Sequence, residues 1–185
     1  MTKKISFEKL NSSDPQVRYK FLQELISIAS KSPEILYKDI DKISELLESE
    51  NKIIKWTGIE LIGYLSSVDT ENKTDKFVDR LIQFLHSGQL IISNHAIFAL
   101  GFIAQNKPKF RKKIIKEFLQ IEHDKFKTED CKNISIGKVL DAFKQLLPFI
   151  GSDTNVVEFI VRANTNDKKS TQKRAEELIT KLLVI

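Results

Sequence analysis

Basic side chains recur on one side of several amphipathic segments, and their spacing could bind an anionic partner. Around residues 36–47, 77–85 and 110–121, lysines and arginines fall opposite the apolar stripe if the segments are helical. A row of such cations can hold an acidic peptide or a phosphate backbone. We call this set the basic stripe: Lys38, Lys42, Lys76, Arg80, Lys113, Lys116 and Arg162, with Lys112 beside them. Acidic residues share the same side, so a solvated surface is the alternative interpretation: Asp41, Glu45, Asp79 and Glu158.

The densest run of positive charge is the basic cluster of residues 107–116. Six of its ten positions are basic: Lys107, Lys109, Arg111, Lys112, Lys113 and Lys116. The cluster lies where a helix is expected to begin, and a helix N-terminus attracts anions. It is therefore the single most plausible anion site, and nucleic-acid binding through it is the alternative function. Aromatic residues that could stack on bases are nearly absent, since Phe110 is expected in the core.

The remaining residues with reactive side chains do not form a catalytic or metal-binding pattern. His123 has acidic neighbours, but residues adjacent on a helix point in different directions, whereas metal sites need ligands at three- or four-residue spacing. Cys131 has no histidine partner nearby in sequence and is expected to be a buried hydrophobe. There is no phosphate-binding glycine loop and no serine nucleophile elbow. We therefore predict a protein that is not an enzyme and that binds no metal and no cofactor. Trp56 is expected in the core, with a partly exposed anchor for a partner as the alternative.

The composition restricts the class of protein that carries these residues. The 185 residues include 30 Lys and Arg against 25 Asp and Glu, and 25 of the basic residues are lysines. Six Gly and four Pro are too few for a collagen-like chain or for most β-sandwiches, which need frequent turn residues. One Cys excludes a disulfide scaffold, and no apolar run is long enough to span a membrane. The N-terminus does not resemble a signal peptide, so we expect a cytoplasmic protein.

The elements that position the basic residues are predicted to be paired helices that repeat along the chain. Apolar residues recur at three- and four-residue spacing, which is the helical period. The segments that begin at Val17, Ile54 and Ile92 align with each other at offsets of 37 and 38 residues. A fourth copy around Val139 needs an offset of 43, and a looser fifth copy lies near Ala175. A period of this length, made of two helices, is typical of an α-solenoid. The aligned columns are Val17, Ile54 and Ile92; Phe21, Gly58 and Ala96; Leu25, Ile62 and Leu100; and Ile28, Leu65 and Ile103.

These segments resemble HEAT repeats of the HEAT/armadillo superfamily. Asp14 with Val17-Arg18 is similar to the residues that open the first helix of such repeats, and the stretch from Ala96 to Ile103 is similar to their small-residue core. The resemblance covers roughly residues 14–183. It implies a curved stack that binds a partner on its surface, that catalyses no reaction, and whose second helices line the concave side.

We therefore predict one all-α domain over residues 1–185, a right-handed α-solenoid of four to five antiparallel helix pairs. Small residues should mark helix crossings: Gly58, Gly63, Ala96, Ala99 and Gly101. A short helix near residues 7–10 and the last helix should cap the two ends. The predicted function is a protein-interaction scaffold whose concave, lysine-biased face binds another protein, with an acidic segment as the expected partner. The pairs are expected at 14–49, 51–87, 89–126 and 129–163, with a C-terminal capping helix at 167–185.

Overall fold

A computed structural model describes residues 5–183, and within that range the chain forms helices and no strand. The predicted all-α class is therefore confirmed. The short helix expected near residues 7–10 is the 3₁₀ helix η1, Phe7–Asn11. The last predicted helix is present as α10, while residues 184–185 of that prediction lie outside the described part. The α-helices are α1 (Pro15–Lys31), α2 (Glu34–Tyr37), α3 (Ile40–Glu45), α4 (Lys52–Leu65), α5 (Val78–Leu85), α6 (Leu90–Asn106), α7 (Pro108–Leu119), α8 (Glu129–Ile150), α9 (Thr154–Ala163) and α10 (Lys169–Leu182). Three further 3₁₀ helices are η2 (Leu46–Glu48), η3 (Asp75–Phe77) and η4 (Gln120–His123).

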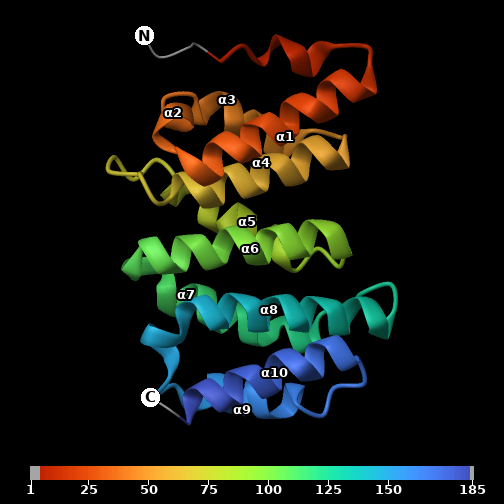
Figure 1. The fold of residues 1–185 in the computed structure, drawn as a ribbon, viewed down its shortest axis with the longest axis vertical. Helices are drawn as coiled ribbons and strands as arrows, with labels where there is room; N and C mark the ends of the chain where they lie inside the picture. The colour runs from red at the N-terminus through yellow and green to blue at the C-terminus, as the bar shows by residue number, and fades with distance from the viewer. Residues whose placement is uncertain (1–4, 184–185) are drawn as a thin grey trace.

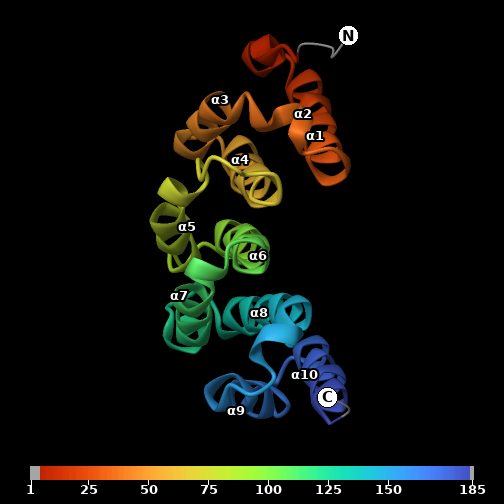
Figure 2. The ribbon, with the colours of Figure 1, turned by 90° about the vertical axis from the view of Figure 1, so that its left-hand side faces the viewer.

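The helices stack in two rows along one long axis (Figure 1, Figure 2). One row contains α1, α4, α6, α8 and α10, and each of these helices packs against its neighbours in the row. The other row contains α2 with α3, then α5, α7 and α9. Helices of the second row also pack on the first-row helix that follows them in the chain: α3 on α4, α5 on α6, and α9 on α10. This arrangement is the stack of helix pairs that the repeat predicted.

Polar side chains cap the N-termini of α1, α4 and α9 at the predicted boundaries. The Asp14 carboxylate accepts a hydrogen bond from the Gln16 backbone N–H at 2.8 Å, and Pro15 occupies the first helical position. Asn51 and Asp153 cap α4 and α9 in the same manner, with the Ile53 and Asn155 N–H groups at 2.9 and 3.0 Å. Each cap satisfies an N–H that the helix itself leaves unpaired. The starts of these helices are therefore specified by local sequence.

Small residues bring the helices of the first row close together, as predicted. A Cβ atom added at Gly63 would lie only 2.7 Å from the Ala99 Cα, so α4 and α6 almost touch there. A Cβ at Gly101 would lie 3.3 Å from the Cβ of Ala142 in α8. Between the rows, large side chains such as those of Phe118, Phe143 and Phe159 fill the core, with ring centroids 6.0 and 5.6 Å apart.

This difference in packing explains which face is concave, and here the prediction was wrong. The row with small residues is the shorter arc, so the stack bends toward it. Figure 2 shows α1 and α10 leaning to the same side, with α5 and α7 on the opposite, outer side. We call α1, α4, α6, α8 and α10 the inner row, and α2, α3, α5, α7 and α9 the outer row. The second helices of the predicted pairs therefore line the convex side and not the concave one.

No helix in residues 5–183 combines the length and the apolar character that crossing a membrane requires.

Candidate functional site

The structure places every residue of the basic stripe on the outer row. Lys42 lies on α3, Lys76 on η3 and Arg80 on α5. Lys38 follows α2 directly, and Arg162 lies in the last turn of α9. The cluster residues Arg111, Lys112, Lys113 and Lys116 are on α7. All of these residues therefore lie on the outer helices or on the segments that join them, which form the convex side and not the concave side to which the prediction assigned them.

Four members of the basic stripe pair with acidic side chains of the preceding repeat. The Lys76 ammonium lies 3.3 Å from an Asp41 carboxylate oxygen, and Lys113 pairs with Asp79. Arg80 donates to Glu48 at 2.7 and 3.1 Å. Arg162 donates to Glu122 at 2.8 and 3.3 Å. These pairs neutralise much of the stripe, and each exposed pair contributes at most about 1 kcal/mol of stability.

The remaining basic residues of the outer row differ in what they contact. Within the described range, Lys38, Lys42, Lys112 and Lys116 have no carboxylate within 4 Å. Arg111 donates to the Ala104 carbonyl at 3.0 Å, and its guanidinium lies 3.6 Å from the centre of the Phe149 ring. Arg111 is therefore used to join α7 to its neighbours.

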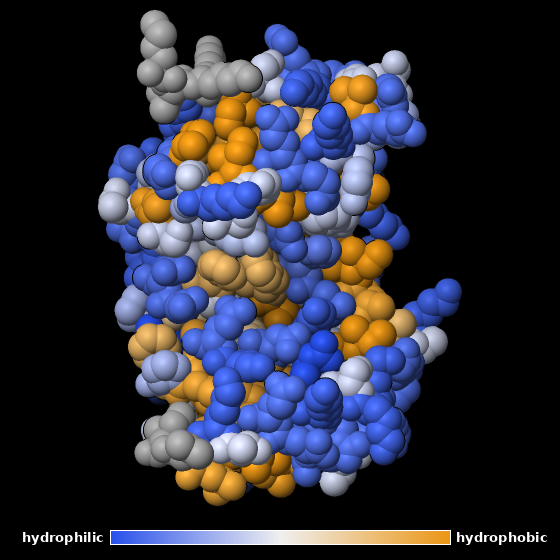
Figure 3. Space-filling model, viewed as in Figure 1, coloured by the Kyte–Doolittle hydropathy of each residue, from blue (hydrophilic) through white to orange (hydrophobic). Residues whose placement is uncertain are grey.

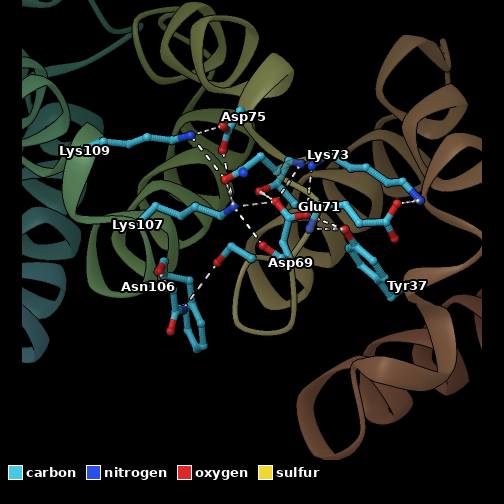
Figure 4. Close-up of polar contacts among 12 residues, drawn as sticks. Tyr37, Asp69, Glu71, Lys73, Asp75, Asn106, Lys107 and Lys109 are labelled. Atoms are coloured by element: carbon cyan, nitrogen blue, oxygen red, sulfur yellow. Dashed lines mark hydrogen bonds and ion pairs between the residues drawn. The ribbon is translucent and has the colours of Figure 1, made fainter.

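The basic cluster of residues 107–116 is divided by the fold, because its first lysine is buried (Figure 4). The Lys107 side chain is 8% exposed, and its ammonium lies 2.7 Å from the Asp69 carboxylate. The same ammonium donates at 3.1 Å to the Asp69 carbonyl and to the Asn72 side-chain oxygen. Lys109 pairs with Asp75 beside it. Lys107 therefore fastens the loop of residues 66–74 to the start of α7 and is not available to an external anion, whereas Lys109 is paired but exposed.

Asp69 is the acceptor at the centre of this loop. Its carboxylate accepts hydrogen bonds from the Lys73 and Thr74 backbone N–H groups at 2.8 and 2.9 Å, and also from the Tyr37 hydroxyl. Burial alone would raise the pKa of Asp69, but the hydrogen bonds from Lys107, Thr74 and Tyr37 outweigh it and hold the pKa well below its ordinary value. Burial and the Asp69 carboxylate raise the pKa of Tyr37 to about 12. Asp69 and Lys107 thus form a structural ion pair, and the neighbouring polar groups donate hydrogen bonds to the Asp69 carboxylate.

The inner row carries a different set of exposed side chains, which the sequence analysis did not select as a binding surface. They fall in three aligned columns, one or two residues away from core columns. Tyr19 is 51% exposed, and the side chains of Trp56 and Phe98 are half-buried. A search of the repeat alignment for columns that hold aromatic or amide side chains outside the core columns would have found these residues. The columns are Tyr19, Trp56 and Asn94; Gln23, Glu60, Phe98 and Asp141; and Ser27, Tyr64, Phe102 and Gln145.

Trp56 is both a packing residue and part of the inner surface. Its indole stacks on the His95 ring, with centroids 4.4 Å apart and planes at 10°. His95 Nδ1 in turn lies 2.7 Å from a Glu60 carboxylate oxygen. The stack joins α4 to α6 and holds the His95 ring in one orientation. Trp56 is therefore half-buried. It packs on the core, as expected, and the rest of its ring remains at the inner surface.

An aromatic cluster continues this surface toward the other end of α4 and α6. The Tyr64 ring lies 5.2 Å from Phe98 and 5.0 Å from Phe102, and the two Phe rings are 4.8 Å apart. Burial raises the pKa of Tyr64. In Figure 3, apolar side chains gather on this face over α6, between hydrophilic regions, and the surface is hollowed below them. Aromatic groups on a half-open face are typical of protein-binding surfaces.

Other reactive residues are dispersed over the fold. His86 lies 2.8 Å from Asp124 and 3.3 Å from Glu117, at the end of α5. Cys131 is half-buried in the first turn of α8. Within residues 5–183, no three His, Cys, Asp or Glu side chains are grouped so that they could hold a metal ion.

No family model and no curated protein sequence matches the chain. It is similar to two solved structures of engineered proteins from the Northeast Structural Genomics Consortium. The first is 17% identical with a TM-score of 0.55 over 96% of this chain and 77% of that chain. The second is 20% identical with a TM-score of 0.53 over 91% and 75%. A third similar structure, of computationally designed armadillo repeat proteins for modular peptide recognition, is 16% identical with a TM-score of 0.53 over 91% and 76%.

These likenesses extend over nearly the whole chain, and they show the fold. The chain has an all-α fold whose helices pack as in armadillo-like repeat solenoids, which is the fold that the resemblance to HEAT repeats implied. Repeat solenoids of this kind present extended concave surfaces for binding.

Proposed function

We propose that this chain is a non-enzymatic, cytoplasmic scaffold that binds an extended segment of a partner protein along its inner row. The observation that carries the proposal is the set of aligned aromatic, amide and carboxylate side chains on the concave face. Tyr19, Trp56 and Phe98 present rings there, while the core is filled by other columns. The similar designed armadillo proteins were made for peptide recognition, which supports the same use of this fold.

The chemistry expected of the partner changes with the position of the basic stripe. An acidic segment was expected because lysines were assigned to the concave face. Since those lysines lie on the outer row and several are paired, the proposal assigns no net charge to the partner. Nucleic-acid binding through residues 107–116 loses its main support, because Lys107 is buried against Asp69 and Lys109 pairs with Asp75.

The test compares two matched double variants in which exposed glutamines become arginines. Gln23→Arg with Gln145→Arg places bulk and charge on the inner row, and Gln83→Arg with Gln120→Arg does the same on the outer row. Partners are captured from the native cell with each form and identified by mass spectrometry. We expect the wild type and the outer variant to retain the same partner, and the inner variant to lose it. Loss with the outer variant alone, or retention by both variants, would contradict the proposal.

A further inference from the structure

A hollow of about 660 Å³ opens on the inner face between α6 and α8. Figure 3 shows this depression beside the apolar patch over α6. Its apolar lining is formed by Ile91, Ile97, Phe98 and Ala142. The polar residues that also line it, which we call the rim, include Glu60, Asp141 and Lys144. The volume exceeds that of any single side chain, so the hollow can admit one large residue together with part of its backbone.

The charged groups of the rim are already satisfied by neighbours in the chain. Glu60 lies 2.7 Å from His95 Nδ1, and Asp141 accepts a hydrogen bond from Arg174 at 2.9 Å. Lys144 donates to Glu177 at 3.0 Å, and this pairing lowers the pKa of Glu177. The remaining rim cation, Lys138, lies 3.8 Å from Asp141. Because these charges already have partners in the chain, a charged guest would compete with existing pairs, whereas a neutral guest would not.

The apolar lining favours an aromatic guest among the neutral ones. Ile91 and the half-exposed Phe98 ring supply the accessible apolar surface of the lining, whereas Ala142 lies at the close contact of α6 and α8 beside Gly101. The Phe98 ring is held from behind by Tyr64 and Phe102 and is half-exposed. Aromatic rings associate at centroid distances of about 4.5–7 Å, in edge-to-face or offset geometry. The rim also carries the amide of Asn94, whose side-chain oxygen is occupied by the Ser135 hydroxyl at 3.0 Å.

We propose that this hollow binds a single aromatic side chain of the partner segment and is the anchor position of the inner face. This inference rests on the proposed function, because it names the residue class that the inner row recognises. An aromatic anchor desolvates a large apolar area in one place, and such residues dominate the affinity of protein interfaces. The flanking residues of the segment then lie along the columns of Trp56 and Tyr64.

The test uses random twelve-residue peptides displayed on phage and selected against the full chain. The selected peptides are synthesised, and each residue is replaced by Ala in turn. We expect one aromatic residue whose replacement weakens binding by about tenfold or more. If the essential residue is charged or aliphatic, the inference is wrong.

Variants of the chain locate the anchor. Gln145→Trp places a large side chain at the rim of the hollow, and Gln83→Trp is the matched change on the outer row. We expect only Gln145→Trp to weaken the aromatic peptides by about tenfold. Phe98→Leu, which keeps an apolar lining but removes the ring, should weaken them several-fold and provides a second reading if Gln145→Trp does not fold.

The outcomes separate the inference from the proposed function. Peptides that lose binding to a variant with Gln23→Arg alone, but not to Gln145→Trp or Phe98→Leu, would support inner-face binding and overturn the aromatic anchor. Peptides that bind all inner-row variants equally would overturn both proposals.

Discussion

Lys107 shows how strongly the role of a residue depends on burial. Its ammonium is surrounded by oxygens of Asp69, Asn72 and Asp75, in a place that water would otherwise have to fill. Lys109, two residues later, pairs with the same Asp75 but remains exposed. The local sequence does not distinguish the two lysines, but their contributions to stability differ. Loss of the partner of a buried charge costs more free energy than loss of the partner of an exposed one.

Replacing these lysines by methionine therefore gives unequal results. Lys107→Met leaves the Asp69 carboxylate buried without its cation, and we expect a loss of about 3–5 kcal/mol in the free energy of unfolding. Lys109→Met removes an exposed pair and should cost at most about 1 kcal/mol. Urea denaturation followed by circular dichroism measures both values. Equal losses would show that Lys107 is not the buried partner of Asp69.

The low pKa of Asp69 predicts a loss of stability in acid. The pKa is depressed in the folded chain, so the stabilisation is complete above the ordinary Asp pKa of about 3.9 and is lost as the pH falls below it. Urea midpoints measured from pH 7 down to pH 3 should therefore fall less steeply below pH 5 for Asp69→Asn than for the wild type. Asp79→Asn, which removes an exposed carboxylate on the outer row, is the control. A slope for Asp69→Asn identical to that of the wild type would contradict the assignment.

At the scale of the element, the inner helices are defined by the small residues along them. The small residues Gly63, Ala99 and Gly101 were predicted correctly to mark helix crossings. Each repeat of a solenoid contacts only its neighbours, so the same kind of contact recurs along the chain. The same pattern did not reveal which row is concave, since curvature follows from the difference in spacing between two rows. The acid–base pairs Asp41–Lys76 and Asp79–Lys113 were also readable in principle, because their members are one repeat apart. Burial of Lys107 was not readable, since nothing in its local sequence differs from that of an exposed lysine.

The close approach of α4 and α6 predicts different tolerance at two glycines. Gly63→Ala would gain up to about 1 kcal/mol of helix propensity, but its Cβ would lie 2.7 Å from the backbone of α6. Overpacking of this kind costs about 1–3 kcal/mol, so we expect a net loss of stability. Gly101→Ala meets only the Ala142 side chain at 3.3 Å and should be less destabilising. Thermal unfolding of the two variants ranks them, and the reverse order would contradict the packing described for the inner row.

At the scale of the whole molecule, the stack is closed by a different element at each end and has two unlike faces. The open side of α10 carries Lys173, Glu176 and Thr180, which are exposed, while Ala175 and Leu178 face the stack. At the other end η1 packs against α1 through Phe7 and Phe21, whose ring centroids are 6.0 Å apart. The fold class, the repeat and both capping elements could be predicted from the sequence, because each follows from local periodicity. The binding face that we propose could not, since charge drew attention to the outer row and the inner columns look like ordinary core positions.

Site-specific photo-crosslinking tests the central claim, that the inner row binds the partner, most directly. A benzophenone amino acid is introduced singly at Gln23, Gln145, Gln83 and Gln120, which are exposed positions divided equally between the two rows. The partner is then crosslinked in the native cell and detected by its mass shift. The account predicts crosslinks from Gln23 and Gln145 and none from Gln83 and Gln120. Crosslinks to the same partner from the outer pair alone would contradict it.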